Sequence, residues 1–441
     1  MSHFHEFYHT MHDGTLKQIN PFTRTEVWAV PGRSDKPIEN VSLKEPVKIN
    51  AKSKEDEDYC KFCTKKYFFT PPEKERVIFE NNQFKTISIK SFEELEMSYA
   101  YFRRIANLFE IVTYNYWKEN YNYKISDTLL QRKEEYFSTK NGIDHVLNIV
   151  DTKLKASGID PIKVSEHEKL NEHANSFFAG CHELIIGSRH YKENAQFNHE
   201  LCSSGEMTLE EHYQYINFTI RTMDNIFKNN RFVRYVTVFQ NWLAPAGASF
   251  DHLHKQLVGL DEWGASIGKR INLVRENRNV FNELSVNFAT YNDLIFAEND
   301  HAIAFADIGH RFPSIAIYSK SIQPYPTRQS EDEIRGMSSL VYACHKAMTS
   351  QVSCNEEWYY TPYDTIDVIP WHILLKWRIN IPAGFEGGTD IYINPISPVQ
   401  VRDKMVPKLY ELRNQGLIGN IRIAEECHIP HNPLLYYRYK S

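Results

Sequence analysis

The chain has 441 residues and a mass of 51.8 kDa, which corresponds to two or three domains at roughly 150 residues each. The 51 basic and 56 acidic residues leave a formal net charge of −5, which argues against a protein held mainly by nucleic-acid phosphates. No apolar run approaches the roughly 18 residues of a membrane span, so we expect neither a nucleic-acid nor a membrane partner. Seven cysteines, an odd number, and a polar start indicate a reducing compartment. The composition therefore predicts a cytoplasmic globular protein.

Strands and helices alternate irregularly along the chain. Runs rich in β-branched and aromatic residues predict strands at Glu183–Gly187, Phe232–Gln240, His301–Ala306, Pro313–Tyr318 and His372–Asn380. Helical spacing of apolar residues predicts helices at Leu209–Phe227, Asp332–Met348 and Pro398–Arg413. The first helix is preceded by Thr208 and has Glu211 three residues later, the pattern of a capping box. Strands outnumber helices and lie close together, which predicts an α+β fold with largely antiparallel sheets.

Two parts of the sequence show the same order of elements. One block leads through a long helix to strands near residues 232–256, and another leads from His301 through a long helix to His372. Each block ends close to a histidine. This pattern indicates an internal duplication.

The segment 238–259, VFQNWLAPAGASFDHLHKQLVG, contains the most informative motif. Residues two apart in a strand point to the same side, so His252, His254 and Gln256 would line one face and Lys255 the other. The small residues at 244–249 allow a backbone to approach a ligand closely. Adjacent histidines suit metal binding or nucleophilic catalysis, and the alternative is an ordinary strand with an exposed polar face.

A CxxC motif is formed by Cys60 and Cys63. The two thiolates have the right spacing for zinc, but a structural zinc site needs four ligands. A redox pair is the alternative, although the surrounding sequence shows no βαβ pattern. The remaining cysteines are predicted to be isolated core or surface thiols: Cys181, Cys202, Cys344, Cys354 and Cys427.

Several longer segments have a familiar form and occur in a familiar order. They are NPFTRTEVWAVPGRSDKP (20–37), CKFCTKKYFFTPPE (60–73), GCHELII (180–186), NWLAPAGASFDHLHKQ (241–256), AFADIGHRFP (304–313), AGFEGGT (383–389) and YINP (392–395). With these motifs the sequence resembles the galactose-1-phosphate uridylyltransferase family. That family is the nucleotidyltransferase branch of the histidine-triad superfamily, in which HxHxQ replaces three alternating histidines.

The resemblance implies two tandem histidine-triad-like halves, which we place at residues 1–285 and 286–441. The first would carry the zinc knuckle and the catalytic HxHxQ, and the second would contribute the sugar side of the substrate site. The implied reaction resembles that of a UDP-glucose–hexose-1-phosphate uridylyltransferase and follows a ping-pong course. His254 attacks the α-phosphorus of a nucleoside diphosphate sugar and displaces the sugar 1-phosphate, with Gln256 at the phosphates. The protein is expected to be a homodimer.

The resemblance also assigns further residues. The nucleotide and phosphates would be bound by Arg33, Lys36, Asn107, Asn241, Gly247 and Ser249, and the sugar by Phe385 and Glu386. One structural zinc would be held by Cys60, Cys63, His252 and a fourth histidine, for which His190 is the best candidate and His182 and His199 are alternatives.

Two segments depart from the family pattern. The regions 318–322 and 370–372 lack two ligands of the family's second metal site, so we expect no second metal. The segment 241–245, NWLAP, is bulkier than usual, which predicts a reshaped nucleotide pocket. Three alternatives stay open: a phosphorylase of nucleoside diphosphate sugars or dinucleoside polyphosphates, a zinc-stabilised nucleotide-binding protein without turnover, and a zinc hydrolase. The hydrolase would need a carboxylate, and Asp251 would point to the opposite face.

Overall fold

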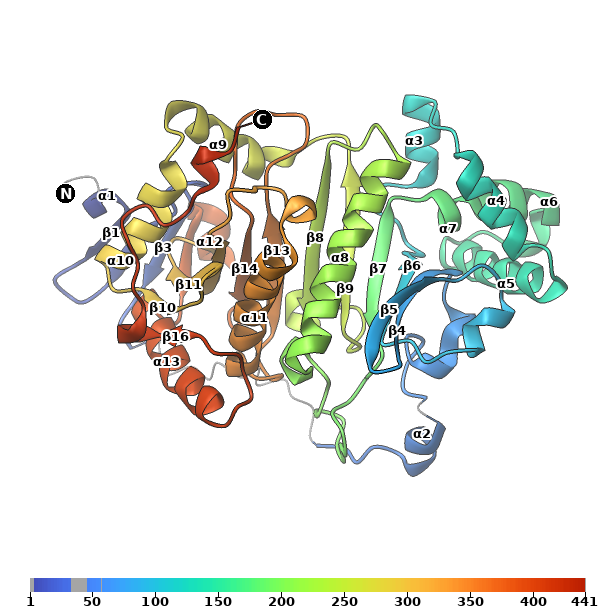
Figure 1. The fold of residues 1–441 in the computed structure, drawn as a ribbon, viewed down its shortest axis with the longest axis horizontal. Helices are drawn as coiled ribbons and strands as arrows, with labels where there is room; N and C mark the ends of the chain where they lie inside the picture. Colours follow the sequence, from blue (N-terminus) through green and yellow to red (C-terminus); the bar gives the residue numbers. More distant parts are fainter. Residues whose placement is uncertain (1–3, 33–45, 57, 441) are drawn as a thin grey trace.

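A computed structural model describes residues 4–32, 46–56 and 58–440. Its main feature is one twelve-stranded sheet in which every neighbouring pair is antiparallel (Figure 1). The strands follow the order β16 (Arg422–Ile423), β10 (Ile295–Glu298), β11 (Ala302–Asp307), β12 (Ser314–Ser319), β14 (His372–Trp377), β13 (Cys354–Tyr359), β8 (Tyr235–Trp242), β9 (His254–Leu260), β7 (His182–Gly187), β6 (Phe102–Ala106), β4 (Glu73–Glu80) and β5 (Gln83–Ser88).

This strand order is symmetric about the central β13–β8 pair. On one side β8 is followed by β9, β7 and β6, and on the other β13 is followed by β14, β12 and β11. A long helix precedes each central strand, α8 (Leu209–Asn229) before β8 and α11 (Glu331–Met348) before β13. The predicted α+β fold with two similar, largely antiparallel halves is confirmed. The boundary between residues 285 and 286 stays a prediction.

The two long helices cover the same face of the large sheet (Figure 1). Both begin with a capping box, at Thr208 and Ser330, which satisfies free backbone N–H groups of the first turn. In α8 the apolar side chains of Ile216, Ile220 and Met223 recur on one side and are buried. Each such burial contributes roughly 1.5–3 kcal/mol to folding, so the amphipathic pattern is what fixes the helix on the sheet.

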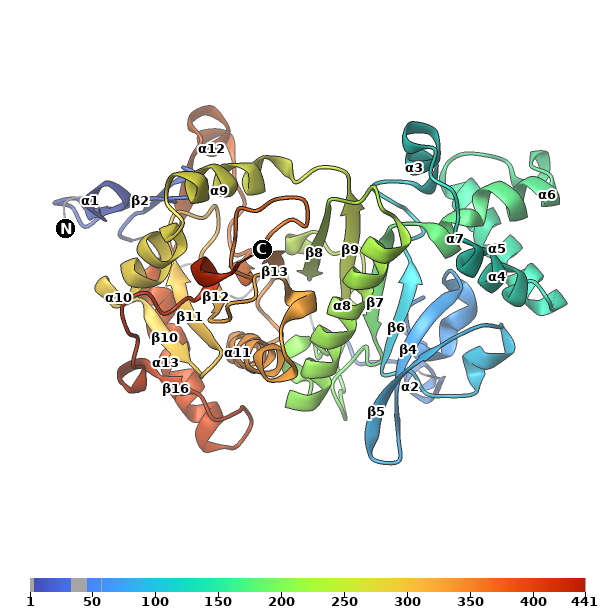
Figure 2. The same cartoon turned by 45° about the horizontal axis from the view of Figure 1, so that its top comes forward.

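The remaining elements surround this core. A second sheet contains β1 (Tyr8–Thr10), β2 (Leu16–Ile19), β3 (Glu26–Ala29) and β15 (Ile391–Asn394), with β3 and β15 parallel (Figure 2). The other helices are α1 (Phe4–Phe7), α2 (Ala51–Asp56), α3 (Tyr114–Tyr121), α4 (Asp127–Tyr136), α5 (Lys140–Ala156), α6 (Glu166–Glu168), α7 (Asn175–Ala179), α9 (Gly264–Glu276), α10 (Phe288–Tyr291), α12 (Gly384–Thr389) and α13 (Pro398–Asn414). Across the described residues, no helix is long and apolar enough to cross a bilayer.

The side chains of β9 divide between the two faces of the sheet. Lys255 is buried under the helices, where its Nζ lies 4.7 Å from the ring centroid of Tyr215 in α8. It also forms an ion pair with Glu356 of β13. As predicted, Lys255 points away from His254 and Gln256, which therefore lie on the opposite face.

Candidate active site and metal centre

Four side chains from three distant segments converge at the start of β9. They are Cys60, Cys63, His190 and His252, and their ligand atoms all lie within 4.8 Å of one another. The Sγ atoms of the two cysteines are 3.8 Å apart, Cys60 Sγ is 3.5 Å from His252 Nδ1, and the two Nδ1 atoms are 3.3 Å apart. A tetrahedron with Zn–S near 2.3 Å and Zn–N near 2.05 Å has edges of about 3.8, 3.5 and 3.3 Å. The cluster therefore has the donor set and the dimensions of a tetrahedral Cys2His2 metal site.

Neighbouring groups orient these ligands. His252 Nε2 lies 2.7 Å from the carbonyl oxygen of Gly187, so its Nε2–H donates there and Nδ1 faces the cluster. The hydrogen bond from the Cys60 thiol lowers the pKa of the Cys63 thiol, while burial acts in the opposite direction. Of the three candidates for the fourth ligand, the structure brings His190 to the cluster.

His254 begins β9 with a fixed ring orientation. Its Nδ1 lies 2.8 Å from the carbonyl oxygen of His252. A carbonyl can only accept, so Nδ1 carries the proton and the lone pair resides on Nε2. The side chain is 5% exposed, its ring packs against Phe62, and burial lowers its pKa. The neutral imidazole is the nucleophilic form, and it is present at physiological pH.

Three polar side chains of the first half form a hydrogen-bonded cluster: one from β7, one from β9 and one from the residue after β6. His182 Nδ1 accepts from the backbone N–H of Ile111 at 3.1 Å, so its Nε2–H donates to Gln256 Oε1, also at 3.1 Å. The Asn107 amide nitrogen lies 3.4 Å from the same oxygen. The structure thus brings Asn107 and His182 to the side chain of Gln256, and the nucleotide-binding role expected of Asn107 stays a prediction. The alternation of His182 with Leu184 and Ile186 along β7 was the sequence signal available for including His182.

Trp242, the largest side chain in the segment before HxHxQ, does not face the site. Trp242 is buried on the helix side, where its Nε1 donates to the backbone oxygen of Ser350 at 2.8 Å. Asn241 lies on the same face as His254, and its Oδ1 accepts from Asn355 Nδ2 at 2.7 Å. Gly247 has φ +86°, a left-handed conformation that glycine adopts readily. The Trp242 ring therefore lies behind the sheet, and the prediction that the bulky segment 241–245 reshapes the nucleotide pocket stays a prediction.

The remaining expected site residues come from three further segments of the chain. Ser249 is exposed in the loop before β9. Phe385 and Glu386 belong to α12, which packs on β15 of the small sheet, and Glu386 accepts a hydrogen bond from the backbone N–H of Ala383 at 2.8 Å. Arg33 and Lys36 lie outside the described residues.

A comparison with known protein families identifies the family of this chain. The family described as "Domain of unknown function (DUF4921)" matches residues 11–436. The chain belongs to this family. No curated protein matches it significantly.

Two solved structures share the fold. An ADP-glucose phosphorylase from Arabidopsis thaliana with bound ADP-glucose has a TM-score of 0.55 at 16% identity, covering 88% of this chain and 97% of that one. A GalT-like protein from the same plant has a TM-score of 0.53 at 16% identity, covering 79% and 92%. Both structures share the fold of this chain, which confirms the tandem fold expected from the resemblance.

Proposed function

We propose that this protein is a nucleotidyltransferase that acts on a nucleoside diphosphate sugar through a covalent intermediate on His254. The observation that supports this most strongly is the anchoring of Nδ1 by the His252 carbonyl at 2.8 Å. It leaves Nε2 unprotonated and holds the ring rigid, which are the two requirements of a nitrogen nucleophile. The fold shared with an ADP-glucose phosphorylase adds support.

In the first step His254 Nε2 attacks the α-phosphorus, and the bond from that phosphorus to the sugar 1-phosphate oxygen breaks. The leaving group departs as a phosphate anion and needs no strong acid. In the second step an oxygen of the acceptor phosphate attacks the same phosphorus, and the electron pair of the P–N bond returns to Nε2. Gln256, whose carbonyl is held by His182, presents its amide nitrogen as a donor to the phosphate oxygens.

We propose zinc as the metal of the Cys2His2 cluster, in a structural role. Four protein ligands fill a tetrahedral site and leave no open position for substrate. The ion would fix His252, whose carbonyl in turn orients His254. The zinc-hydrolase alternative needs His254 on the metal, and it is disfavoured because His254 is not among the residues whose ligand atoms converge.

The proposal has two forms, which differ in the molecule that accepts the nucleotidyl group. A hexose 1-phosphate as acceptor gives a uridylyltransferase-like reaction, and inorganic phosphate gives a phosphorylase. The ADP-glucose phosphorylase with the same fold makes the second form a specific candidate. The homodimer expected from the resemblance belongs to this proposal in both forms.

Intact-chain mass spectrometry after incubation with UDP-glucose and ADP-glucose tests the function. We expect the mass of one nucleotidyl group to be added to the wild-type chain and to be removed by the correct acceptor. His254→Ala should form no adduct and lose transfer by at least 10⁴-fold, about 5 kcal/mol in the barrier. His199→Ala, outside the metal cluster, is the matched control. Full activity of folded His254→Ala protein would contradict the proposal.

A further inference from the structure

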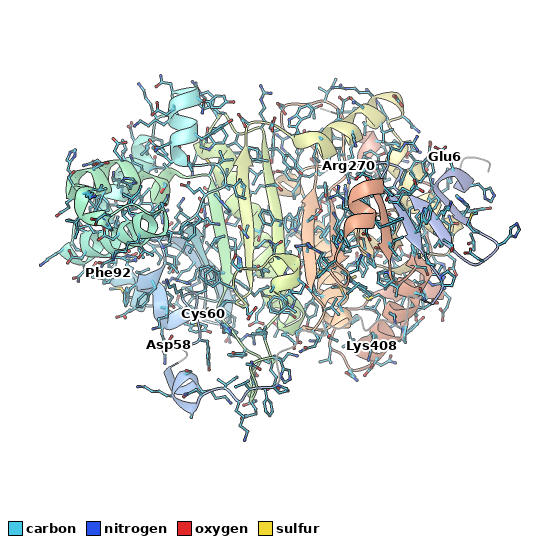
Figure 3. The ribbon with its side chains drawn as sticks, turned by 180° about the vertical axis from the view of Figure 1, so that it is seen from behind. Glu6, Asp58, Cys60, Phe92, Arg270 and Lys408 are labelled. Atoms are coloured by element: carbon cyan, nitrogen blue, oxygen red, sulfur yellow. The ribbon has the colours of Figure 1, made fainter. Side chains whose placement is uncertain are left out.

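A strongly basic cavity of about 400 Å³ lies over strands β13 and β14 of the second half. It opens on the face of the sheet opposite α8 and α11, where β13 and β14 lie next to α9. Figure 3 shows this face, with Arg270 of α9 and Cys60 labelled. Five cationic side chains line the cavity together with a single carboxylate, that of Glu357: Lys269, Arg270, Arg311, Lys376 and Arg378.

Most of this positive charge has no anionic partner. Lys376 is paired with Glu357, with 2.6 Å between Nζ and the carboxylate oxygen. For the other four cations, no carboxylate of the described residues lies within 4 Å. Arg270 is 3% exposed, and its Nε has no hydrogen-bond partner, as is also true of Arg378 Nε. Buried charges are normally paired, so the buried guanidinium of Arg270, among three further cations without a carboxylate, indicates a missing anion.

The cavity lies at a position equivalent to the catalytic site of the first half. His372 begins β14 as His254 begins β9, and its Nδ1 lies 2.8 Å from the carbonyl oxygen of Pro370. Two residues on, Leu374 occupies the position that Gln256 holds in β9, and it lines the cavity. His372 itself is 1% exposed because the rings of Tyr318 and Tyr359 stack on its two sides.

From this excess of positive charge and from the position of the cavity we propose that the cavity is a second, non-catalytic site that binds the phosphoryl groups of a small phosphorylated ligand. Guanidinium groups recognise phosphate oxygens through paired hydrogen bonds. The volume suits a small molecule and not a macromolecular segment. A covered histidine and a leucine take the places that His254 and Gln256 have in the first half, so we expect the site to bind without transferring.

The cavity is also connected to the catalytic half. Arg378 donates to Asn355 Oδ1 at 2.8 Å. Asn355 in turn donates to Asn241 Oδ1 at 2.7 Å and to the backbone oxygen of Ala246 at 2.8 Å. An anion bound to Arg378 would therefore be linked through two hydrogen bonds to the loop that precedes HxHxQ. The experiment must distinguish binding in the cavity from binding at the catalytic site.

Titration calorimetry with inorganic pyrophosphate on the full chain provides this separation. We expect Arg378→Gln and Arg311→Gln each to weaken pyrophosphate binding by at least 10-fold. Arg278→Gln, an exposed arginine outside the cavity, is the matched control and should bind as the wild type does. Arg311 is exposed too, so its loss does not threaten folding, which circular dichroism would verify.

A His254→Ala/Gln256→Ala double variant distinguishes the cavity from the catalytic site. It should bind pyrophosphate with wild-type affinity even though transfer is lost. Wild-type affinity in Arg378→Gln/Arg311→Gln would overturn the proposal. So would loss of binding in the His254→Ala/Gln256→Ala variant, because the anion would then occupy the catalytic site. Neither result depends on whether the chain is a nucleotidyltransferase.

Discussion

His254 and His372 have the same backbone setting and opposite surroundings. Each begins the strand next to the central pair and donates from Nδ1 to the carbonyl two residues earlier, at 2.8 Å in both cases. In the first half the cross-strand neighbour on β7 is Ile186, and in the second half the equivalent residue on β12 is Tyr318. A second tyrosine, Tyr359, covers the other side of His372. Strand geometry alone therefore orients an imidazole, and the neighbouring side chains decide whether it can react.

The same comparison extends to the next positions along the strands. Gln256 accepts a hydrogen bond from His182 in the first half, whereas the equivalent residues in the second half are Leu374 and Ser314. At these positions the second half thus lacks the hydrogen-bonded polar pair of the first half. Its cationic cavity lies over the same strand, β14. Two copies of one topology can diverge by changing only residues on one face.

The metal cluster distinguishes the two halves, because the described residues of the second half contain no comparable group of metal ligands. We expect about one zinc per chain by elemental analysis and nearly none in Cys60→Ser. The free energy of unfolding should fall by several kcal/mol, a fraction of the roughly 10–16 kcal/mol that structural zinc provides. Cys427→Ser, in the second half, is the control. Two equivalents of zinc, or unchanged content in Cys60→Ser, would contradict this assignment.

The contact between the halves can be broken at Lys255, which is fully buried against Glu356. Burial alone would raise the pKa of Glu356, but Lys255 and His345 lower it, so this carboxylate is charged in the folded protein. Lys255→Met leaves a buried charge without its main partner and should cost about 3–5 kcal/mol of stability. Chemical denaturation would measure the loss.

The double variant Lys255→Met/Glu356→Gln removes both charges and should recover most of that stability. It also tests cooperativity between the halves. If they fold as one unit, fluorescence and circular dichroism should give coincident transitions in both variants. An undiminished stability of Lys255→Met alone would show that the pair contributes nothing to joining the halves.

The sequence allowed the prediction of features that depend on local periodicity. Alternation along one strand places His254 and Gln256 together and sends Lys255 to the other face, and capping patterns locate the long helices. Contacts between distant strands could not be predicted in this way. The approach of His182 to Gln256 depends on the register of β7 with β9, and the orientation of Trp242 depends on where β8 ends. The cationic cavity collects residues from five separate segments, which no local pattern links to one another.

Glu386 tests whether the second half supplies the sugar side of the reaction. If the substrate is a sugar phosphate, Glu386→Ala should weaken the sugar step by about 1.5–3 kcal/mol, the value of a hydrogen bond to a charged group. Formation of the nucleotidyl-enzyme from a dinucleotide without that sugar should suffer much less. Because Glu386 also caps α12 through the Ala383 N–H, Glu386→Gln serves as the control that keeps an acceptor. Equal losses with both donors would show that Glu386 is structural.

The smallest expected effect comes from making the first half resemble the second at one position, with His182→Ser. The variant loses the hydrogen bond to Gln256 Oε1, and nucleotidyl transfer should fall by about 1 kcal/mol, roughly five-fold. The pH dependence of stability offers a separate readout. Burial lowers the pKa of His182 to about 4, while an unfolded histidine has a pKa near 6.5.

Between these values the unfolded chain binds a proton that the folded chain does not, so stability falls as the pH drops from about 6.5 toward 4. The His182 contribution to this fall is on the order of 2 kcal/mol, and it should be missing in His182→Ser. Comparing the unfolding free energies of both proteins at pH 7 and pH 4.5 cancels the groups that they share. Identical pH profiles would mean that His182 is not held neutral at the catalytic face, and the orientation proposed for Gln256 would then lose its support.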